Sequence, residues 1–196
     1  MVETVKLYTR QNDKTLHALE TKKRIINVRE YVKLHFKEDA TLFLESYDWF
    51  TQEAQKIVAK PDDVTAPIWC SISSENCRRP IPGTVVYILE VPKEKVIYFD
   101  ETKWDRVLNR IYIPTDEKDN EEYEKRLQKK GIANKFEFFI GKYKNIYPEE
   151  NEIIKKSWNR IFKIDNWSIY NVCGNIWEIK SEWVRKIIKY GEPFEE

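Results

Sequence analysis

The stretch that decides the fold is Thr84-Val85-Val86-Tyr87-Ile88-Leu89-Glu90-Val91. Apolar and β-branched side chains occupy both of its faces, a pattern typical of a strand that is covered on both sides. We therefore expect this segment to lie inside a sheet. Residues 95–99 follow after a short turn and are expected to pair with it.

Other segments are expected to complete this sheet and to cover it. Alternating polar and apolar residues predict a first strand over residues 4–10, and helical spacing of apolar residues predicts helices over 43–57 and from Pro148. The remaining expectations are strands at 67–73, 168–172 and 175–179, helices that begin at Asp100 and Ser181, and a charged surface helix between Asp116 and Lys130. The whole chain, residues 1–196, is thus predicted to form a single α+β domain with a mainly antiparallel sheet and several short flanking helices.

The bulk composition excludes several functional classes. Lys and Arg number 34 and Asp and Glu number 33, so a net charge of +1 provides no general field for a nucleic-acid backbone. The five glycines stand apart from one another, and neither a Walker loop nor a Rossmann fingerprint is present. Three cysteines, no signal-peptide pattern and no apolar run of membrane-spanning length predict a cytoplasmic protein with reduced thiols and no membrane partner.

The seven tryptophans indicate a built pocket. Each has a polar or charged residue close by, as in Tyr47-Asp48-Trp49 and Lys103-Trp104-Asp105. An indole can pack a helix against a sheet while its N–H reaches a specific partner. One hypothesis is therefore a non-catalytic cleft for a small molecule, a peptide or a flipped base, with Trp69 and Trp104 as its walls.

Several short motifs follow one another along the chain. They are Leu7-Tyr8-Thr9-Arg10-Gln11, Ser46-Tyr47-Asp48-Trp49-Phe50, Pro67-Ile68-Trp69, Trp104-Asp105 with Val107-Leu108-Asn109, Ser157-Trp158 with Arg160-Ile161-Phe162, and Ile176-Trp177-Glu178-Ile179-Lys180 with Glu182-Trp183-Val184. Together they resemble a bacterial and phage family that is known as a domain of unknown function. The resemblance spans nearly the whole chain and implies a single domain, but it implies no activity. Ser71 departs from the family pattern, which has an aromatic residue at that place.

The layout is also similar, more distantly, to that of ADP-ribosyltransferases. Those enzymes hold NAD between two small sheets, with a polar residue on the first strand, an aromatic or Ser-x-Ser element midway and a late glutamate. The resemblance implies that Arg10 grips the ribose or a phosphate and that the carboxylate of Glu178 stabilises an oxocarbenium-like centre. Further candidates are Tyr47 or Ser71 and Ser73 for the middle element, and Glu182 for the late glutamate.

This leading hypothesis is an NAD-dependent, ADP-ribosyltransferase-like enzyme that takes a nucleotide-type small molecule and has no metal site. Its catalytic residues are Arg10 and Glu178. The residues expected to bind the cofactor are Thr9, Gln11, Tyr47, Trp69 and Asn109. Replacing Arg10 by Ala or Glu178 by Gln is expected to abolish activity and to leave the fold intact.

A third hypothesis is a Mg²⁺-dependent nuclease. Asp165 precedes Glu178-Ile179-Lys180, a spacing that resembles the Asp and Glu-x-Lys set of restriction-type nucleases. Glu178 and Lys180 would share one face of a strand. In such a site two carboxylates hold the metal ion and the lysine orients the attacking water.

Overall fold

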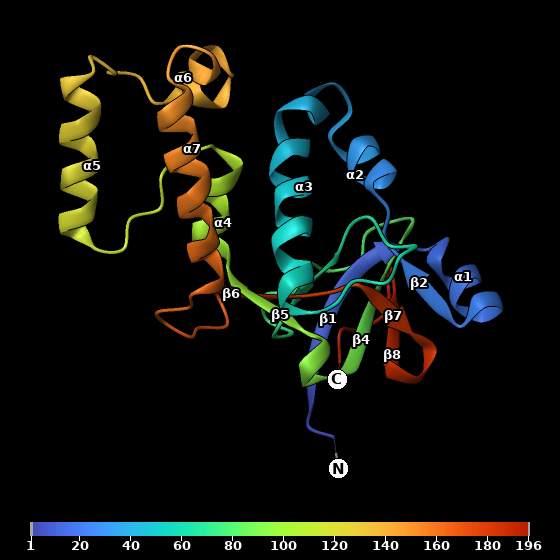
Figure 1. The fold of residues 1–196 in the computed structure, drawn as a ribbon. Helices are drawn as coiled ribbons and strands as arrows, with labels where there is room; N and C mark the ends of the chain where they lie inside the picture. Colours follow the sequence, from blue (N-terminus) through green and yellow to red (C-terminus); the bar gives the residue numbers. More distant parts are fainter. Residues whose placement is uncertain (1, 196) are drawn as a thin grey trace.

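The computed structural model describes residues 2–195 as one large sheet, one small sheet and flanking helices (Figure 1). The large sheet has the strand order β5-β6-β3-β1-β4-β8. Its strands are β1 (Thr4–Asn12), β3 (Ile68–Ser71), β4 (Thr84–Pro92), β5 (Ile97–Asp100), β6 (Val172–Ile176) and β8 (Val184–Lys189). The small sheet pairs β2 (Arg24–Ile26) with β7 (Glu178–Lys180). All these strand pairs are antiparallel, so the predicted α+β domain with a mainly antiparallel sheet is confirmed.

The helices lie mostly where the sequence predicts them. They are α1 (Thr15–Lys22), α2 (Arg29–Phe36), α3 (Ala40–Ile57), α4 (Glu101–Leu108), α5 (Glu117–Lys129), α6 (Phe136–Phe139) and α7 (Pro148–Ser157). Asp100 caps α4 because its carboxylate accepts the backbone N–H of Lys103 at 3.1 Å. Asp116 caps α5 in the same way through the N–H of Asp119 at 2.8 Å. None of the helices in residues 2–195 has the length and apolar character needed to cross a membrane.

β4 is internal, as predicted, but the predicted pairing of residues 95–99 with it is wrong. β4 pairs with β1 along one edge and with β8 along the other, so both edges are occupied. The short helix η2 (Lys93–Lys95) turns the chain away, and β5 pairs with β6 at the far edge of the sheet. The hairpin therefore fails because two strands that are distant in sequence take both places beside β4.

Two further predictions need correction near the C-terminus. The helix expected after Ser181 is the short η5 (Ser181–Trp183) followed by strand β8, whose β-branched residues suit a strand better than a helix. The strands expected at 168–172 and 175–179 are instead β6, which has Gly174 in its middle, and the short strand β7 that follows it. A Cβ at Gly174 would lie 3.0 Å from Cγ1 of Val96 and 3.1 Å from Cδ2 of Leu7, so a residue without a side chain lets the chain run straight through.

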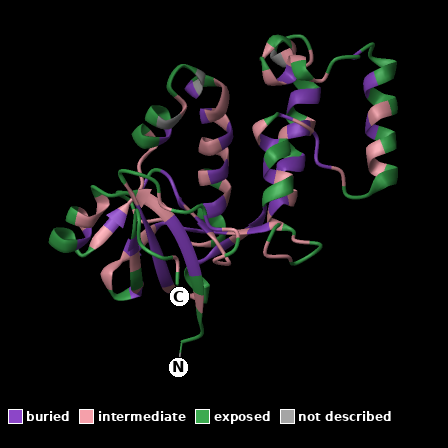
Figure 2. Cartoon of the chain, turned by 180° about the vertical axis from the view of Figure 1, so that it is seen from behind, coloured by how far each residue is buried: buried purple, intermediate pink, exposed green. Residues whose placement is uncertain are grey.

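The two faces of the large sheet have separate cores. On one face, aromatic residues of α3, α4 and the short helix η4 (Trp158–Phe162), among them Phe50, Trp104 and Trp158, pack over Phe99 of β5. On the other face, α1, the small sheet and η5 cover Leu7 and the apolar side chains of β4. The buried residues accordingly run through the sheet and along the inner sides of the helices (Figure 2).

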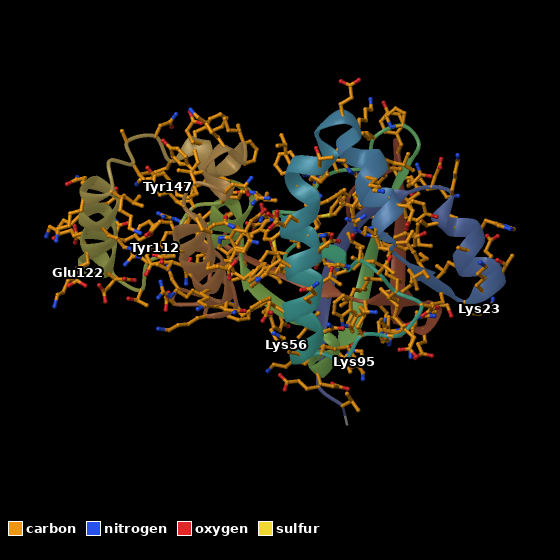
Figure 3. All side chains as sticks on the ribbon, turned by 45° about the horizontal axis from the view of Figure 1, so that its top comes forward. Lys23, Lys56, Lys95, Tyr112, Glu122 and Tyr147 are labelled. Atoms are coloured by element: carbon orange, nitrogen blue, oxygen red, sulfur yellow. The ribbon has the colours of Figure 1, made fainter. Side chains whose placement is uncertain are left out.

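The helices α5, α6 and α7 form a helical lobe beside the sheet (Figure 1). Its inner surface includes Tyr112, whose ring stacks on Tyr123 at 4.1 Å, whereas Glu122 on α5 points to solvent (Figure 3). The carboxylate of Glu150 on α7 has no exposed surface and accepts from Arg126 of α5 at 2.8 Å and from Lys130 at 2.6 Å. This ion-pair cluster fastens α5 to α7.

Candidate functional site

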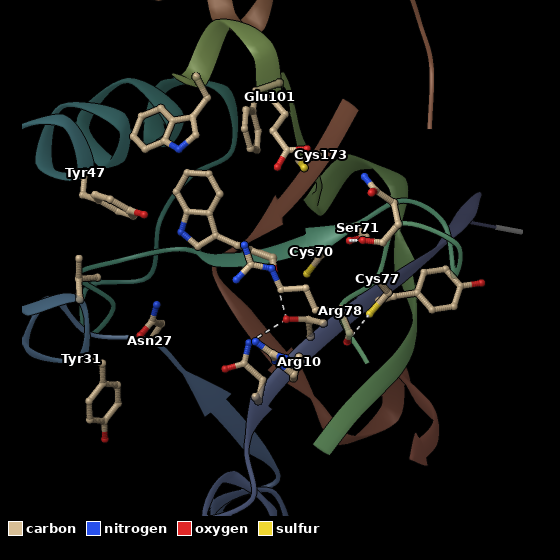
Figure 4. Close-up of a pocket in the computed structure, with 18 of the residues that line it drawn as sticks. Arg10, Asn27, Tyr31, Tyr47, Cys70, Ser71, Cys77, Arg78, Glu101 and Cys173 are labelled. Atoms are coloured by element: carbon tan, nitrogen blue, oxygen red, sulfur yellow. Dashed lines mark hydrogen bonds between the residues drawn. The ribbon is translucent and has the colours of Figure 1, made fainter. Parts of the chain in front are cut away.

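The candidate site lies where the large sheet divides. β1 pairs with β4 along its whole length, but within residues 2–195 it meets β3 at the single register pair Tyr8 and Ser71. Beyond Tyr8 the two strands separate, and the hydroxyl of Thr9 crosses the gap by donating to the carbonyl oxygen of Trp69 at 2.8 Å. The same hydroxyl accepts from Nε2 of Gln11 at 2.8 Å. A cavity of about 840 Å³ opens at this division (Figure 4).

Five of the predicted site residues line this cavity together. Thr9, Arg10 and Gln11 come from β1, Tyr47 from α3 and Trp69 from β3. Thr9 is almost fully buried, which fixes its hydroxyl in one place. The structure thus brings together three of the segments that the sequence motifs picked out separately.

Aromatic rings form one wall of the cavity. The ring of Trp69 lies 5.1 Å from that of Trp104 and 5.5 Å from that of Tyr47, and Phe50 packs behind it at 5.0 Å. Such edge and tilted contacts hold the rings in fixed orientations before any ligand arrives. Burial raises the pKa of Tyr47 to about 12, so its hydroxyl stays neutral and able to donate a hydrogen bond at physiological pH.

Charged groups of both signs also line the cavity. Arg10 is held in place because its Nη1 donates to the carbonyl oxygen of Arg79 at 3.1 Å, and Arg78 reaches inward from the loop after β3 (Figure 4). On the opposite side, α4 contributes Glu101 and Asp105, which are one helical turn apart. The sequence analysis overlooked these two acids, although they flank Trp104 at a spacing that places both on one helix face.

All three cysteines line the same cavity, which no sequence motif indicated. They come from β3 (Cys70), the loop after it (Cys77) and β6 (Cys173). Burial raises the pKa of Cys77 to about 11 and moves the pKa of the other two thiols upward, with the neighbouring Glu101 adding to the effect at Cys173. The thiols are therefore neutral and are poor nucleophiles at physiological pH.

Comparison with known proteins identifies the family. The sequence profile of a domain of unknown function (DUF3841) matches residues 6–185. The chain belongs to this family. The match confirms the resemblance that the ordered motifs suggested, and it covers all the residues that line the cavity. No curated protein and no solved structure matches the chain, so the similarity to ADP-ribosyltransferases has no support from these comparisons.

The predicted catalytic carboxylate lies elsewhere in this DUF3841 member. Glu178 belongs to β7 of the small sheet, where its carboxylate is paired with Arg24 and lies 3.7 Å from Nζ of Lys180. Arg24 is also paired with Asp63 at 2.7 Å. Glu178 is thus neutralised by a basic cluster and does not line the cavity, because β7 leaves the large sheet directly after β6.

Asn109 and the proposed nuclease residues are also apart from the cavity. Asn109 ends α4, is exposed, and donates from Nδ2 to the carbonyl oxygen of Asp105 at 2.8 Å. Asp165 is paired with Lys103 at 2.7 Å, whereas Glu178 is paired with Arg24. In the described part of the chain, no group of three or more His, Cys, Asp or Glu side chains is arranged to hold a metal ion. Asp165 and Glu178 thus have separate basic partners, and neither of them lines the cavity.

Proposed function

We propose that the cavity between β1 and β3 binds a nucleotide-type small molecule, with NAD as the first candidate. The observation that carries this proposal is the convergence of fixed aromatic rings, two arginines and a hydroxyl–amide pair on one cavity. Its volume of about 840 Å³ lies within the range of about 300–1,000 Å³ that is usual for small-molecule sites.

Each kind of group matches one part of a nucleotide. The partly exposed indole of Trp69 offers an apolar surface to a flat ring, and ring stacking is sequence-tolerant and favourable. Arg10 and Arg78 offer guanidinium N–H groups, whose planar fork suits phosphate oxygens. The amide of Gln11 and the hydroxyl of Tyr47 can bond the hydroxyls of a ribose.

Cleavage of the glycosidic bond of NAD is the reaction that we propose for a catalytic form of this site. Such a reaction builds up positive charge on the ribose, which a nearby carboxylate stabilises. Glu101 is the glutamate that lines the cavity and therefore takes the role that the sequence analysis gave to Glu178. A site that binds the nucleotide without cleaving it corresponds to the non-catalytic hypothesis.

Calorimetric titration with NAD, together with an assay for released nicotinamide, tests this proposal. We expect saturable binding that is weakened at least tenfold by Arg10→Ala and by Trp69→Ala. Glu178→Gln is the matched control, because it changes a carboxylate outside the cavity and should leave the affinity unchanged. Release of nicotinamide that requires Glu101 establishes an enzyme, and binding without release establishes a binding module.

Two results would overturn the proposal. One is the absence of binding at millimolar NAD, ATP and AMP by the folded wild-type protein. The other is binding that the two cavity variants leave unchanged, because the ligand would then occupy another part of the molecule.

A further inference from the structure

The cavity has a basic side and an acidic side. Arg10 of β1 and Arg78 of the loop after β3 supply positive charge, and Glu101 and Asp105 of α4 supply negative charge. Figure 4 places Glu101 and Arg10 at opposite ends of the cavity. A ligand that fills the cavity therefore meets opposite charges at its two ends.

These charges are not neutralised by one another or by neighbours. Within residues 2–195, the guanidinium of Arg78 and the carboxylate of Asp105 have no ion-pair partner and no hydrogen bond. Among the same described residues Glu101 also has no ion pair, and the neutral thiol of Cys173 is its hydrogen-bond partner. By contrast, Glu178 and Asp165, two of the acids considered for catalysis from the sequence, are both bound by basic side chains.

Charges that line one cavity favour a ligand with a complementary distribution of charge. We propose that the cavity selects a dipolar ligand, whose cationic group lies against Glu101 and Asp105 and whose anionic group lies against Arg10 and Arg78. This inference rests on the proposed function and narrows it. For a dinucleotide, it means that the positively charged pyridinium ring lies on the α4 side and the diphosphate on the β1 side.

The oxidised and reduced forms of NAD provide a direct comparison. They share the same adenosine, riboses and diphosphate, and the nicotinamide ring is charged only in the oxidised form. A carboxylate several ångströms from a unit charge, in a cavity open to water, changes an affinity by roughly threefold to tenfold. We therefore expect the wild-type protein to bind oxidised NAD about tenfold more tightly than reduced NAD at low ionic strength.

Titration of both forms against five variants tests the inference. Glu101→Gln and Asp105→Asn should each reduce the preference for oxidised NAD by weakening that form alone, and the double variant should remove the preference. Arg10→Ala should weaken both forms by the same factor, because both carry the diphosphate. Glu178→Gln should change neither affinity, and matched thermal unfolding curves show that each variant is folded.

The outcomes separate this inference from the proposed function. Equal affinity of the wild-type protein for the two forms, or an equal loss for both forms in Glu101→Gln and Asp105→Asn, overturns the dipolar site and leaves nucleotide binding standing. Failure of both forms to bind overturns the proposed function and the inference together. A preference for oxidised NAD that survives the double variant also contradicts the role of α4.

Discussion

The helical lobe and the divided part of the sheet differ in how their charged residues are paired. In the helical lobe, the buried carboxylate of Glu150 is matched by Arg126 and Lys130. At the division between β1 and β3, Arg78 and Asp105 line a cavity and have no such partner among the described side chains. Both regions contain charges of both signs, so the pairing of the charges separates the part that supports the fold from the part that we propose to bind a ligand.

The largest expected effect on stability concerns the ion-pair cluster around Glu150 in the helical lobe. Glu150→Gln removes the shared carboxylate and leaves Arg126 and Lys130 side by side. Because the two cations are partly exposed, we expect a loss of about 2–3 kcal/mol in the free energy of unfolding, below the full cost of an isolated buried charge. Urea denaturation at pH 7 measures it. The exposed pair of Lys118 and Glu122 on α5 provides the control, since Glu122→Gln should cost less than about 0.5 kcal/mol.

Acids that are bound by basic side chains, Glu45 of α3 and Glu150 of α7, set the response of the fold to low pH. Although burial alone would raise the pKa of Glu45, hydrogen bonds from Lys155 and Arg110 lower it to about 2, and Arg126 and Lys130 likewise hold the pKa of Glu150 below its usual value. Acids with a lowered pKa stabilise the fold fully above the unfolded pKa of about 4.3, and this contribution is lost as the pH falls through the folded pKa. We expect stability to fall steeply between about pH 4.5 and 2.

Urea denaturation of the wild type and Glu150→Gln across that range checks this prediction. The variant should lose less stability than the wild type on acidification, because one of the linked protonations is absent. Parallel curves for the two proteins would contradict the assigned role of Glu150.

A smaller loss is expected from the packing beneath the cavity. Gly174→Ala places a methyl group 3.0 Å from Val96 and 3.1 Å from Leu7, two buried side chains with little room to move. We expect a loss of about 1–3 kcal/mol in the free energy of unfolding. Gly141→Ala serves as a comparison, because its added methyl group meets open space and only its φ of +84° is unfavourable. A smaller cost at Gly174 than at Gly141 would show that the sheet can shift at this point.

The smallest effects on stability are expected in the cavity itself. Arg78→Ala and Asp105→Asn remove charges that have no partner in the described chain, so the free energy of unfolding should change by less than about 0.5 kcal/mol. Urea denaturation of each variant measures this. A larger loss of stability in either variant would contradict the proposed difference between the helical lobe and the cavity.

Local patterns in the sequence predicted much of the fold but little of its strand order. The strand over 84–91 and the capped helices after Asp100 and Asp116 follow from patterns within a few residues. The partner of a strand depends instead on which distant segments reach its edges, and β1 and β8 took the edges of β4. The β-branched residues of 184–189 could be spaced on a helix or on a strand, and the free edge of β4 decided between them.

The candidate site shows the same difference between what local patterns predict and what distant contacts decide. Thr9, Arg10 and Trp69 were predicted because their motifs place polar groups beside aromatic ones, and these segments do meet. Glu178 was chosen by its position in the chain order, which says nothing about Arg24 of β2, the residue that pairs with it. Glu101 was overlooked because an acid in the first turn of a helix is ordinarily explained by the helix dipole alone.

In the described part of the chain β1 and β3 share one register pair, Tyr8 with Ser71, and this divides the large sheet into two halves. Strands β5, β6 and β3 form one hydrogen-bonded leaf and β1, β4 and β8 another, and the hydroxyl of Thr9 adds a hydrogen bond between the leaves. A ligand that contacts both Arg10 of β1 and Trp69 of β3 would link the two leaves. Binding should then slow amide hydrogen exchange in the leaf that contains β3 and bring the exchange of the two leaves closer together.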